Sequence, residues 1–166
     1  MNIIKTYIIP SLFVILLVSI DQFTKYLATL YLMPISEFVL IDGVFSLLYL
    51  ENAGMAFGLF QGGRWVFIVF TVLALGFMMF FYKSMPKTRY HTVMRAFILM
   101  LVGGGLGNFI DRLRQGFVVD FFYISLIDFP VFNMADVFIT IATIALGIMV
   151  LFVKEPKAIA DAQDNS

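Results

Sequence analysis

The chain has 166 residues, of which 61% are hydrophobic, 17% aromatic and only 13% charged. Because roughly 45 to 50% of residues are apolar in an ordinary globular domain, this composition indicates a membrane protein built as one domain. The net charge of zero gives no electrostatic basis for a nucleic-acid partner, and the absence of cysteine excludes disulfides, thiolate metal sites and a cysteine nucleophile.

Four segments are long and apolar enough to cross a bilayer as helices, which takes about 20 residues each. The first has a stretch at 11–20 that resembles the apolar part of a cleaved signal peptide. No small-x-small cleavage site follows it, however, and the apolar pattern continues to Pro34, so we expect a retained helix. The sequence therefore predicts a mainly helical integral membrane protein with four transmembrane helices, at about 7–32, 65–82, 92–110 and 132–153.

Basic residues predict how these helices are oriented, since cytoplasmic loops are enriched in lysine and arginine. Most of the eleven basic residues lie near the N-terminus, in and around the connection 83–91, and in the tail 154–166. We therefore expect both termini in the cytoplasm, and the two longer loops, 33–64 and 111–131, on the extracytoplasmic side.

The two outer loops carry strand signals. In EFVLIDGVFSLLYLENAG, residues 37–54, apolar runs flank Asp42-Gly43, a dipeptide suited to a tight hairpin turn. We expect a small extracytoplasmic β-sheet lying on the membrane. Such a sheet could contact lipid or an extended lipid-modified peptide, or it could only cover the helices, and this segment alone does not decide between the two.

Carboxylates are the remaining candidates for chemistry. A serine protease of the usual plan needs a histidine base, and the only histidine, His91, lies in the cytoplasmic connection. One histidine without cysteines also argues against a zinc site. Asp120 in GFVVDFFY and Asp136 in FNMADVFI, by contrast, each lie among apolar residues, where an ionisable group usually has a function.

Two such carboxylates can form a catalytic pair. At about 4 Å and an effective dielectric of about 20 they would repel by roughly 4 kcal/mol and so share one proton, as in aspartic proteases. Asn133 is placed to cap the last helix, with Asp136 in its first turn, which would favour the ionised form of Asp136. The alternative is that Asp136 is only a helix N-terminal acid and Asp120 only a loop acid.

Five blocks of sequence, in order, resemble the bacterial lipoprotein signal peptidase family, signal peptidase II. The resemblance implies a membrane aspartyl endopeptidase that cleaves diacylglyceryl-modified prolipoproteins just before the lipidated cysteine, at the outer side of the bacterial cytoplasmic (inner) membrane. It implies no metal and no organic cofactor. The blocks are DQFTK (21–25), NAGMAFG (52–58), GGGLGNFIDR (103–112), VVDFF (118–122) and FNMADVFI (132–139).

On the matching positions, the resemblance makes Asp120 and Asp136 the catalytic pair. It places a set of polar and small residues around the substrate and the pair, namely Asn52, Gly54, Asn108, Arg112, Asn133 and Ala135. Arg112 could bind substrate or lipid carbonyls, or hold loop structure through a carboxylate. We expect prolipoproteins and membrane lipids as partners, and a functional monomer.

Asp21 and Lys25 are four residues apart, so they can form an ion pair within one helix. We interpret this pair as structural rather than as a substrate contact. The glycines in GGGLG, residues 103–107, are interpreted mainly as positions where helices approach closely.

Two other classes of protein compete with the peptidase. A small proton-coupled carrier would use buried aspartate and arginine along a pathway, but the candidate charges gather at one face of the predicted bundle. A non-catalytic membrane scaffold would explain the glycines and aromatic residues, but it leaves the surroundings of Asp120 and Asp136 unexplained.

Overall fold

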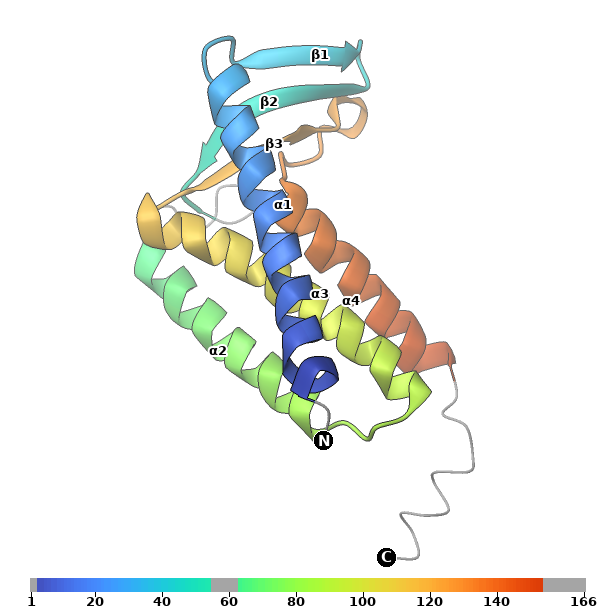
Figure 1. The fold of residues 1–166 in the computed structure, drawn as a ribbon. Coiled ribbons are helices and arrows are strands. Elements are labelled where there is room, and N and C mark those ends of the chain that lie inside the picture. The colour runs from blue at the N-terminus through green and yellow to red at the C-terminus, as the bar shows by residue number, and fades with distance from the viewer. Residues whose placement is uncertain (1–2, 55–62, 154–166) are drawn as a thin grey trace, which may run out of the picture.

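Helix α3 (Arg89–Arg114) is the central helix of the protein, and the other three helices pack around it (Figure 1). We describe residues 3–54 and 63–153 of a computed structural model. The surrounding helices are α1 (Ile9–Tyr31), α2 (Arg64–Ser84) and α4 (Met134–Phe152). A short π-helical turn, η1 (Ile4–Ile8), directly precedes α1. All four are long and apolar enough to cross a membrane.

The predicted four helices are thus confirmed. Helices α2 and α3 are longer than the expected spans 65–82 and 92–110, whereas α4 is shorter than 132–153. The start of α1 and the end of α4 lie at the same end of the molecule, opposite the sheet (Figure 1). That this end is cytoplasmic, and where each span meets the bilayer, remain predictions.

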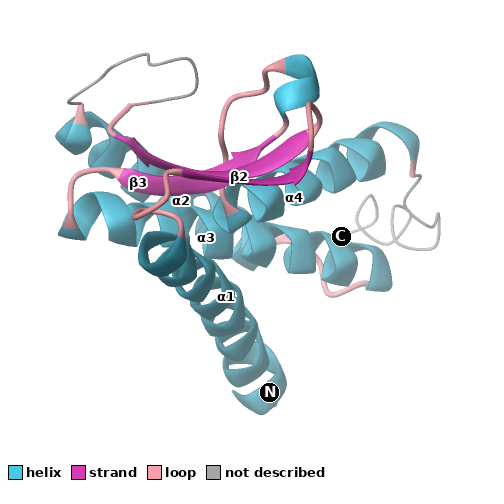
Figure 2. Cartoon of the chain, turned by 90° about the horizontal axis from the view of Figure 1, so that it is seen from above, coloured by secondary structure: helices cyan, strands magenta, loops and turns pink. Residues whose placement is uncertain are grey.

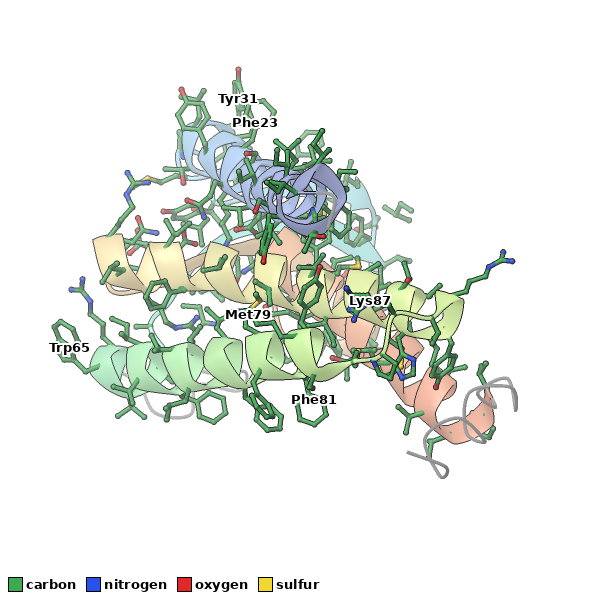
Figure 3. The ribbon with its side chains drawn as sticks, turned by 60° about the horizontal axis from the view of Figure 1, so that its bottom comes forward. Phe23, Tyr31, Trp65, Met79, Phe81 and Lys87 are labelled. Carbon is green, nitrogen blue, oxygen red and sulfur yellow. The ribbon has the colours of Figure 1, made fainter. Side chains whose placement is uncertain are left out.

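Much of the outer helix surface is apolar and exposed, as expected of a surface that faces lipid. Phe23 and Tyr31 on α1, and Trp65 and Phe81 on α2, are between 45% and 68% exposed. Their side chains point away from the other helices (Figure 3).

The three strands form one antiparallel sheet in the order β1 (Glu37–Ile41), β2 (Phe45–Asn52) and β3 (Val118–Tyr123). Asp42-Gly43 connects β1 to β2 as predicted, and Gly43 has a φ of 66°, which glycine adopts without strain. Figure 2 shows the sheet lying across one end of the helices. Beneath it, Ala28 and Leu32 of α1 pack against Val119 and Phe121, so the sheet is fixed to the bundle.

Glycines of α3 allow its neighbours to approach closely, as predicted for 103–107. A Cβ atom at Gly103 would lie 2.9 Å from Cβ of Leu17 in α1. At Gly104 it would lie 2.6 Å from the carbonyl oxygen of Ala135 in α4, and at Gly107 it would overlap the Asp21 carboxylate. Larger residues at these positions would push α1 and α4 away from α3.

We therefore predict that Gly107→Ala destabilises the protein by about 2 kcal/mol, a typical cost for an overpacked core position. The added methyl group would displace the Asp21 carboxylate. Thermal unfolding in a single detergent is the measurement. Gly76→Ala in α2 is the matched control, since no heavy atom lies within 4 Å of the added Cβ and alanine favours a helix. Equal unfolding temperatures for the two variants would contradict the packing role of Gly107.

Candidate functional site

A pocket of about 460 Å³ is lined by residues of α3, α4, β2 and β3. Two of the predicted residues, Asp120 and Asp136, lie in its wall. Four more predicted residues line it as well: Asn52, Gly54, Asn108 and Arg112. The remaining wall is largely apolar and includes the segment 129–132 before α4.

Backbone pairing explains how β2, β3 and the start of α4 meet here. Asn52 is the partner of Val118 in the sheet register. Asp120, two residues further along β3, is therefore on the same face as Asn52 and diagonal to it. Phe132 and Phe122 exchange backbone hydrogen bonds of 2.8 and 3.0 Å. This bridge brings Asn133 next to Asp120.

Asp120 is almost fully buried, with 2% of its surface exposed. One carboxylate oxygen accepts a hydrogen bond from Nδ2 of Asn133 at 2.6 Å, and the other accepts one from Nδ2 of Asn52 at 2.8 Å. Burial raises the pKa of Asp120 from 3.8 to about 7, and the nearby Asp136 charge also raises it, while the bonds from the two asparagines lower it. Asp120 can therefore carry a proton near neutral pH.

Asp136 lies in the first turn of α4, which Asn133 caps as predicted. Oδ1 of Asn133 accepts the N–H of Asp136 at 3.1 Å, and Oδ2 of Asp136 accepts the N–H of Asn133 at 3.1 Å. The other carboxylate oxygen of Asp136 accepts Nδ2 of Asn108 at 2.8 Å. The positive end of the helix dipole also favours a negative charge at this position.

Asn133 connects the two aspartates, because its side chain bonds Asp120 and its backbone bonds Asp136. It is completely buried. Each of the four carboxylate oxygens thus accepts one N–H group, which fixes the orientation of both carboxylates. Since a carboxylate oxygen can accept more than one hydrogen bond, each can still bind a water molecule or a proton.

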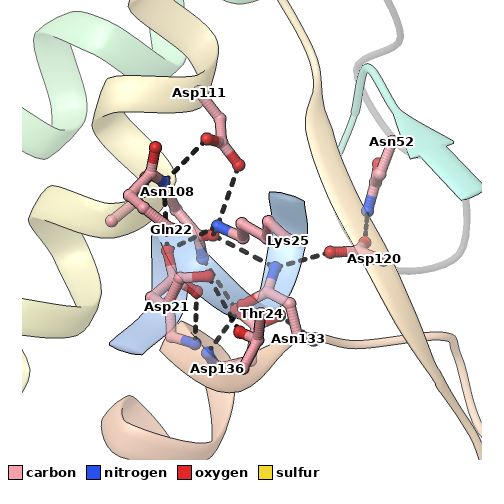
Figure 4. Close-up of polar contacts among 12 residues, drawn as sticks. Asp21, Gln22, Thr24, Lys25, Asn52, Asn108, Asp111, Asp120, Asn133 and Asp136 are labelled. Atoms are coloured by element: carbon pink, nitrogen blue, oxygen red, sulfur yellow. Dashed lines mark hydrogen bonds and ion pairs between the residues drawn. The ribbon is translucent and has the colours of Figure 1, made fainter. Parts of the chain in front are cut away.

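A buried ion cluster supports this arrangement from the side of α1. Nζ of Lys25 lies 2.9 Å from Asp21 and 2.8 Å from Asp111. It also donates to Oδ1 of Asn108 at 2.8 Å (Figure 4). Because Oδ1 of Asn108 faces Lys25, its Nδ2 faces Asp136. The predicted Asp21–Lys25 pair is present, and it holds the amide that contacts Asp136.

Two members of this cluster were not predicted. Asp111 on α3 completes the ion cluster, and Gln22 donates to Asp111 at 2.9 Å and to the carbonyl oxygen of Gly107 at 3.2 Å. Their positions in the sequence could have indicated a role in the site, because both lie within the blocks that carry the family resemblance. Gln22 follows Asp21 in the block 21–25, and Asp111 lies one helical turn after Asn108 in the block 103–112.

Ala135 and Arg112 have structural contacts in addition to their place in the motifs. Ala135 is fully buried outside the pocket wall, and its N–H donates to Asp21 at 2.9 Å, which ties α4 to α1. Arg112 lines the pocket and donates to the carbonyl oxygen of Gly54 at 3.2 Å, with its guanidinium 4.8 Å from the centre of the Phe67 ring. Within residues 3–54 and 63–153, no three histidine or carboxylate side chains are arranged to hold a metal ion.

Comparisons with known proteins agree with the family resemblance. The family model described as "Signal peptidase (SPase) II" matches residues 13–152. The chain is 42% identical over 141 residues to the lipoprotein signal peptidase of Clostridioides difficile, covering 85% of this chain and 93% of that protein. It is 46% identical over 136 residues to the lipoprotein signal peptidase of Caldanaerobacter subterraneus, covering 81% and 90%.

Two solved structures, each described as a bacterial membrane enzyme, have the same fold. One superposes with a TM-score of 0.77 at 31% identity and covers 90% of this chain and 96% of its own. The other has a TM-score of 0.75 at 33% identity and covers 88% of both chains. These comparisons give no support to a carrier. With its family model matched over most of its length, the chain belongs to the signal peptidase II family of membrane peptidases.

Proposed function

We propose that this peptidase is of the aspartic type, with Asp120 and Asp136 as its catalytic pair. The observation that carries the proposal is that both carboxylates line one pocket and are both hydrogen-bonded to one buried residue, Asn133. Its substrates would be diacylglyceryl-modified prolipoproteins, cleaved just before the lipidated cysteine. The names of the relatives, lipoprotein signal peptidases, support lipoprotein precursors as the substrate class.

The geometry supports different roles for the two aspartates. Two hydrogen bonds stabilise the charge of Asp136, one from the side chain of Asn108 and one from the backbone N–H of Asn133. The positive end of the α4 dipole stabilises it further. Asp136 would act as the base. Asp120, whose pKa is about 7, would carry the proton and act as the acid.

Catalysis would then proceed by attack of water on the scissile carbonyl. Asp136 takes a proton from the water as its oxygen bonds to the carbonyl carbon, and Asp120 gives its proton to the carbonyl oxygen. The resulting diol collapses: Asp136 returns its proton to the departing nitrogen, and one hydroxyl proton of the diol goes back to Asp120. The signal peptide leaves with a new carboxyl group, and both aspartates regain their starting states.

The surroundings of the pocket support a substrate held at the membrane. Every residue of β1 is exposed, including the apolar run 38–41, which would contact acyl chains near the hairpin. Holding the lipidated residue there would position the scissile bond and remove part of the entropic barrier. That the protein functions as a monomer stays a prediction.

We further propose that the protein lies in the bacterial cytoplasmic membrane with the pocket toward the extracytoplasmic face. The sheet and the pocket lie at one end of the bundle, and the connection between α2 and α3, with Lys83 and Lys87, lies at the other. The enrichment of cytoplasmic loops in basic residues supports this orientation.

Asp120→Asn and Asp136→Asn are each expected to lower kcat by at least about a hundredfold, because each removes an acid–base group. The measurement is cleavage of a diacylglyceryl-modified prolipoprotein by purified protein in detergent, with the cleavage position identified by mass spectrometry. Thermal unfolding checks that each variant is folded. Asp42→Asn, in the exposed hairpin turn, is the matched control and should cleave like the wild type. If either aspartate variant is folded and keeps near wild-type activity, the assignment of the catalytic pair is refuted.

Cleavage should also fall as the pH rises through about 7. Below this pH Asp120 is protonated and can act as the acid; above it the proton is lost, so kcat/KM declines. Asn52 donates to Asp120 and thereby lowers its pKa. In Asn52→Ala the alkaline limb of the pH profile should therefore move to higher pH, whatever happens to the maximal rate. A limb that stays in place or moves to lower pH would contradict the role of Asp120 as the acid.

A further inference from the structure

Thr140 on α4 is a polar residue of the pocket that the catalytic scheme does not use. It follows Asp136 by four residues, so both lie on the same helix face, and both line the pocket. Its side chain is exposed. After Asp136, the only polar side chains of α4 are those of Thr140 and Thr143.

The hydroxyl of Thr140 has no hydrogen-bond partner among the described residues. Two other helical threonines donate to the carbonyl oxygen four residues earlier: Thr29 bonds Lys25 at 3.0 Å, and Thr92 bonds Thr88 at 2.7 Å. This common arrangement is not made by Thr140, so its donor remains available to a molecule in the pocket.

The other side-chain donors of the pocket wall already bond to the protein. Asn52 donates to Asp120, Asn108 to Asp136 and Arg112 to Gly54. Thr140 lies about 6 Å further along α4 than Asp136, at a rise of 1.5 Å per residue. Since α4 runs away from the sheet (Figure 1), Thr140 is at the end of the pocket nearer the middle of the bundle.

The substrate has a matching need for a donor at this place. A signal peptide that crosses the membrane as a helix must become extended at the scissile bond. The last four carbonyl groups of a helix have no partner within it, and unsatisfied backbone groups are costly where water is excluded. A distance of about 6 Å corresponds to about two residues of extended chain.

We propose that Thr140 is a substrate-positioning residue whose hydroxyl donates to a backbone carbonyl of the signal peptide, about two residues before the scissile bond. This inference rests on the proposed function and adds a contact on the signal-peptide side of the pocket. The contact forms with the bound substrate and involves no proton transfer.

The test compares Thr140→Val, Thr140→Ser and Thr143→Val on a diacylglyceryl-modified prolipoprotein in detergent. Valine keeps the shape of threonine without the hydroxyl, and serine keeps the hydroxyl. Thr143 is exposed on the same helix but is not part of the pocket wall, so it controls for loss of a hydroxyl from α4. Thermal unfolding of each variant reports any loss of stability.

Thr140→Val should lower kcat/KM about tenfold, the effect of one lost hydrogen bond, and mainly by raising KM, since the contact is present in both bound substrate and transition state. Thr140→Ser should stay within about twofold of the wild type, and Thr143→Val should match it. Equal activity of Thr140→Val and Thr143→Val, or equal impairment of the serine and valine variants, would overturn the inference.

The same assay separates this inference from the proposed function. If the wild type cleaves before the lipidated cysteine, Asp120→Asn does not, and Thr140→Val cleaves normally, only the role of Thr140 is wrong. If the wild type does not cleave the prolipoprotein, the proposed function fails and the inference fails with it.

Discussion

The arrangement of the site depends on burying the Lys25 ammonium group between α1 and α3. Lys25 is 4% exposed, and its partners Asp21 and Asp111 are 0% and 5% exposed. Isolated charges at such positions would be very costly, so the three groups are stable only together and only when α1 and α3 are close. Lys25 also contacts the side-chain amide of Asn108. The ion cluster that holds α1 against α3 therefore also orients the Asn108 amide in the pocket.

The small residues of α3 and α4 make the close approach possible. Gly107 leaves room for the Asp21 carboxylate, and Gly104 lets the backbone of Ala135 approach α3. The N–H of Ala135 then reaches Asp21, so α4 is held by the same carboxylate that pairs with Lys25. Asp136 is the next residue along α4. Its position is therefore set on one side by the ion cluster and on the other by the Asn133 cap and the bridge to β3.

Local features of the site could be predicted from the sequence, because their partners are a few residues apart. The Asp42-Gly43 turn, the Asn133 cap and the Asp21–Lys25 pair are of this kind. Contacts between distant segments, such as Gln22 and Lys25 with Asp111, have no signature in spacing or periodicity. The closeness of Asp120 to Asp136 was likewise expected from apolar surroundings and family resemblance, not from any local pattern. Helix α3 extends beyond the expected span 92–110 at both ends, where its residues are too polar to be read as part of a span.

A count of charges supports a shared proton in the pair. Asp21, Asp111 and Asp136 are acidic, and Lys25 and Arg112 are basic; the Arg112 charge acts on Asp111, Asp120 and Asp136. With Asp120 protonated, three negative and two positive charges leave the region with one net negative charge. Ionising Asp120 would add a second net negative charge, on a side chain that is almost fully buried. The same burial that stabilises the ion cluster thus favours the protonated form of Asp120, while the N–H groups on Asp136 favour its charge. The fold thereby makes two chemically identical side chains unequal, which is what acid–base catalysis by a carboxyl pair requires.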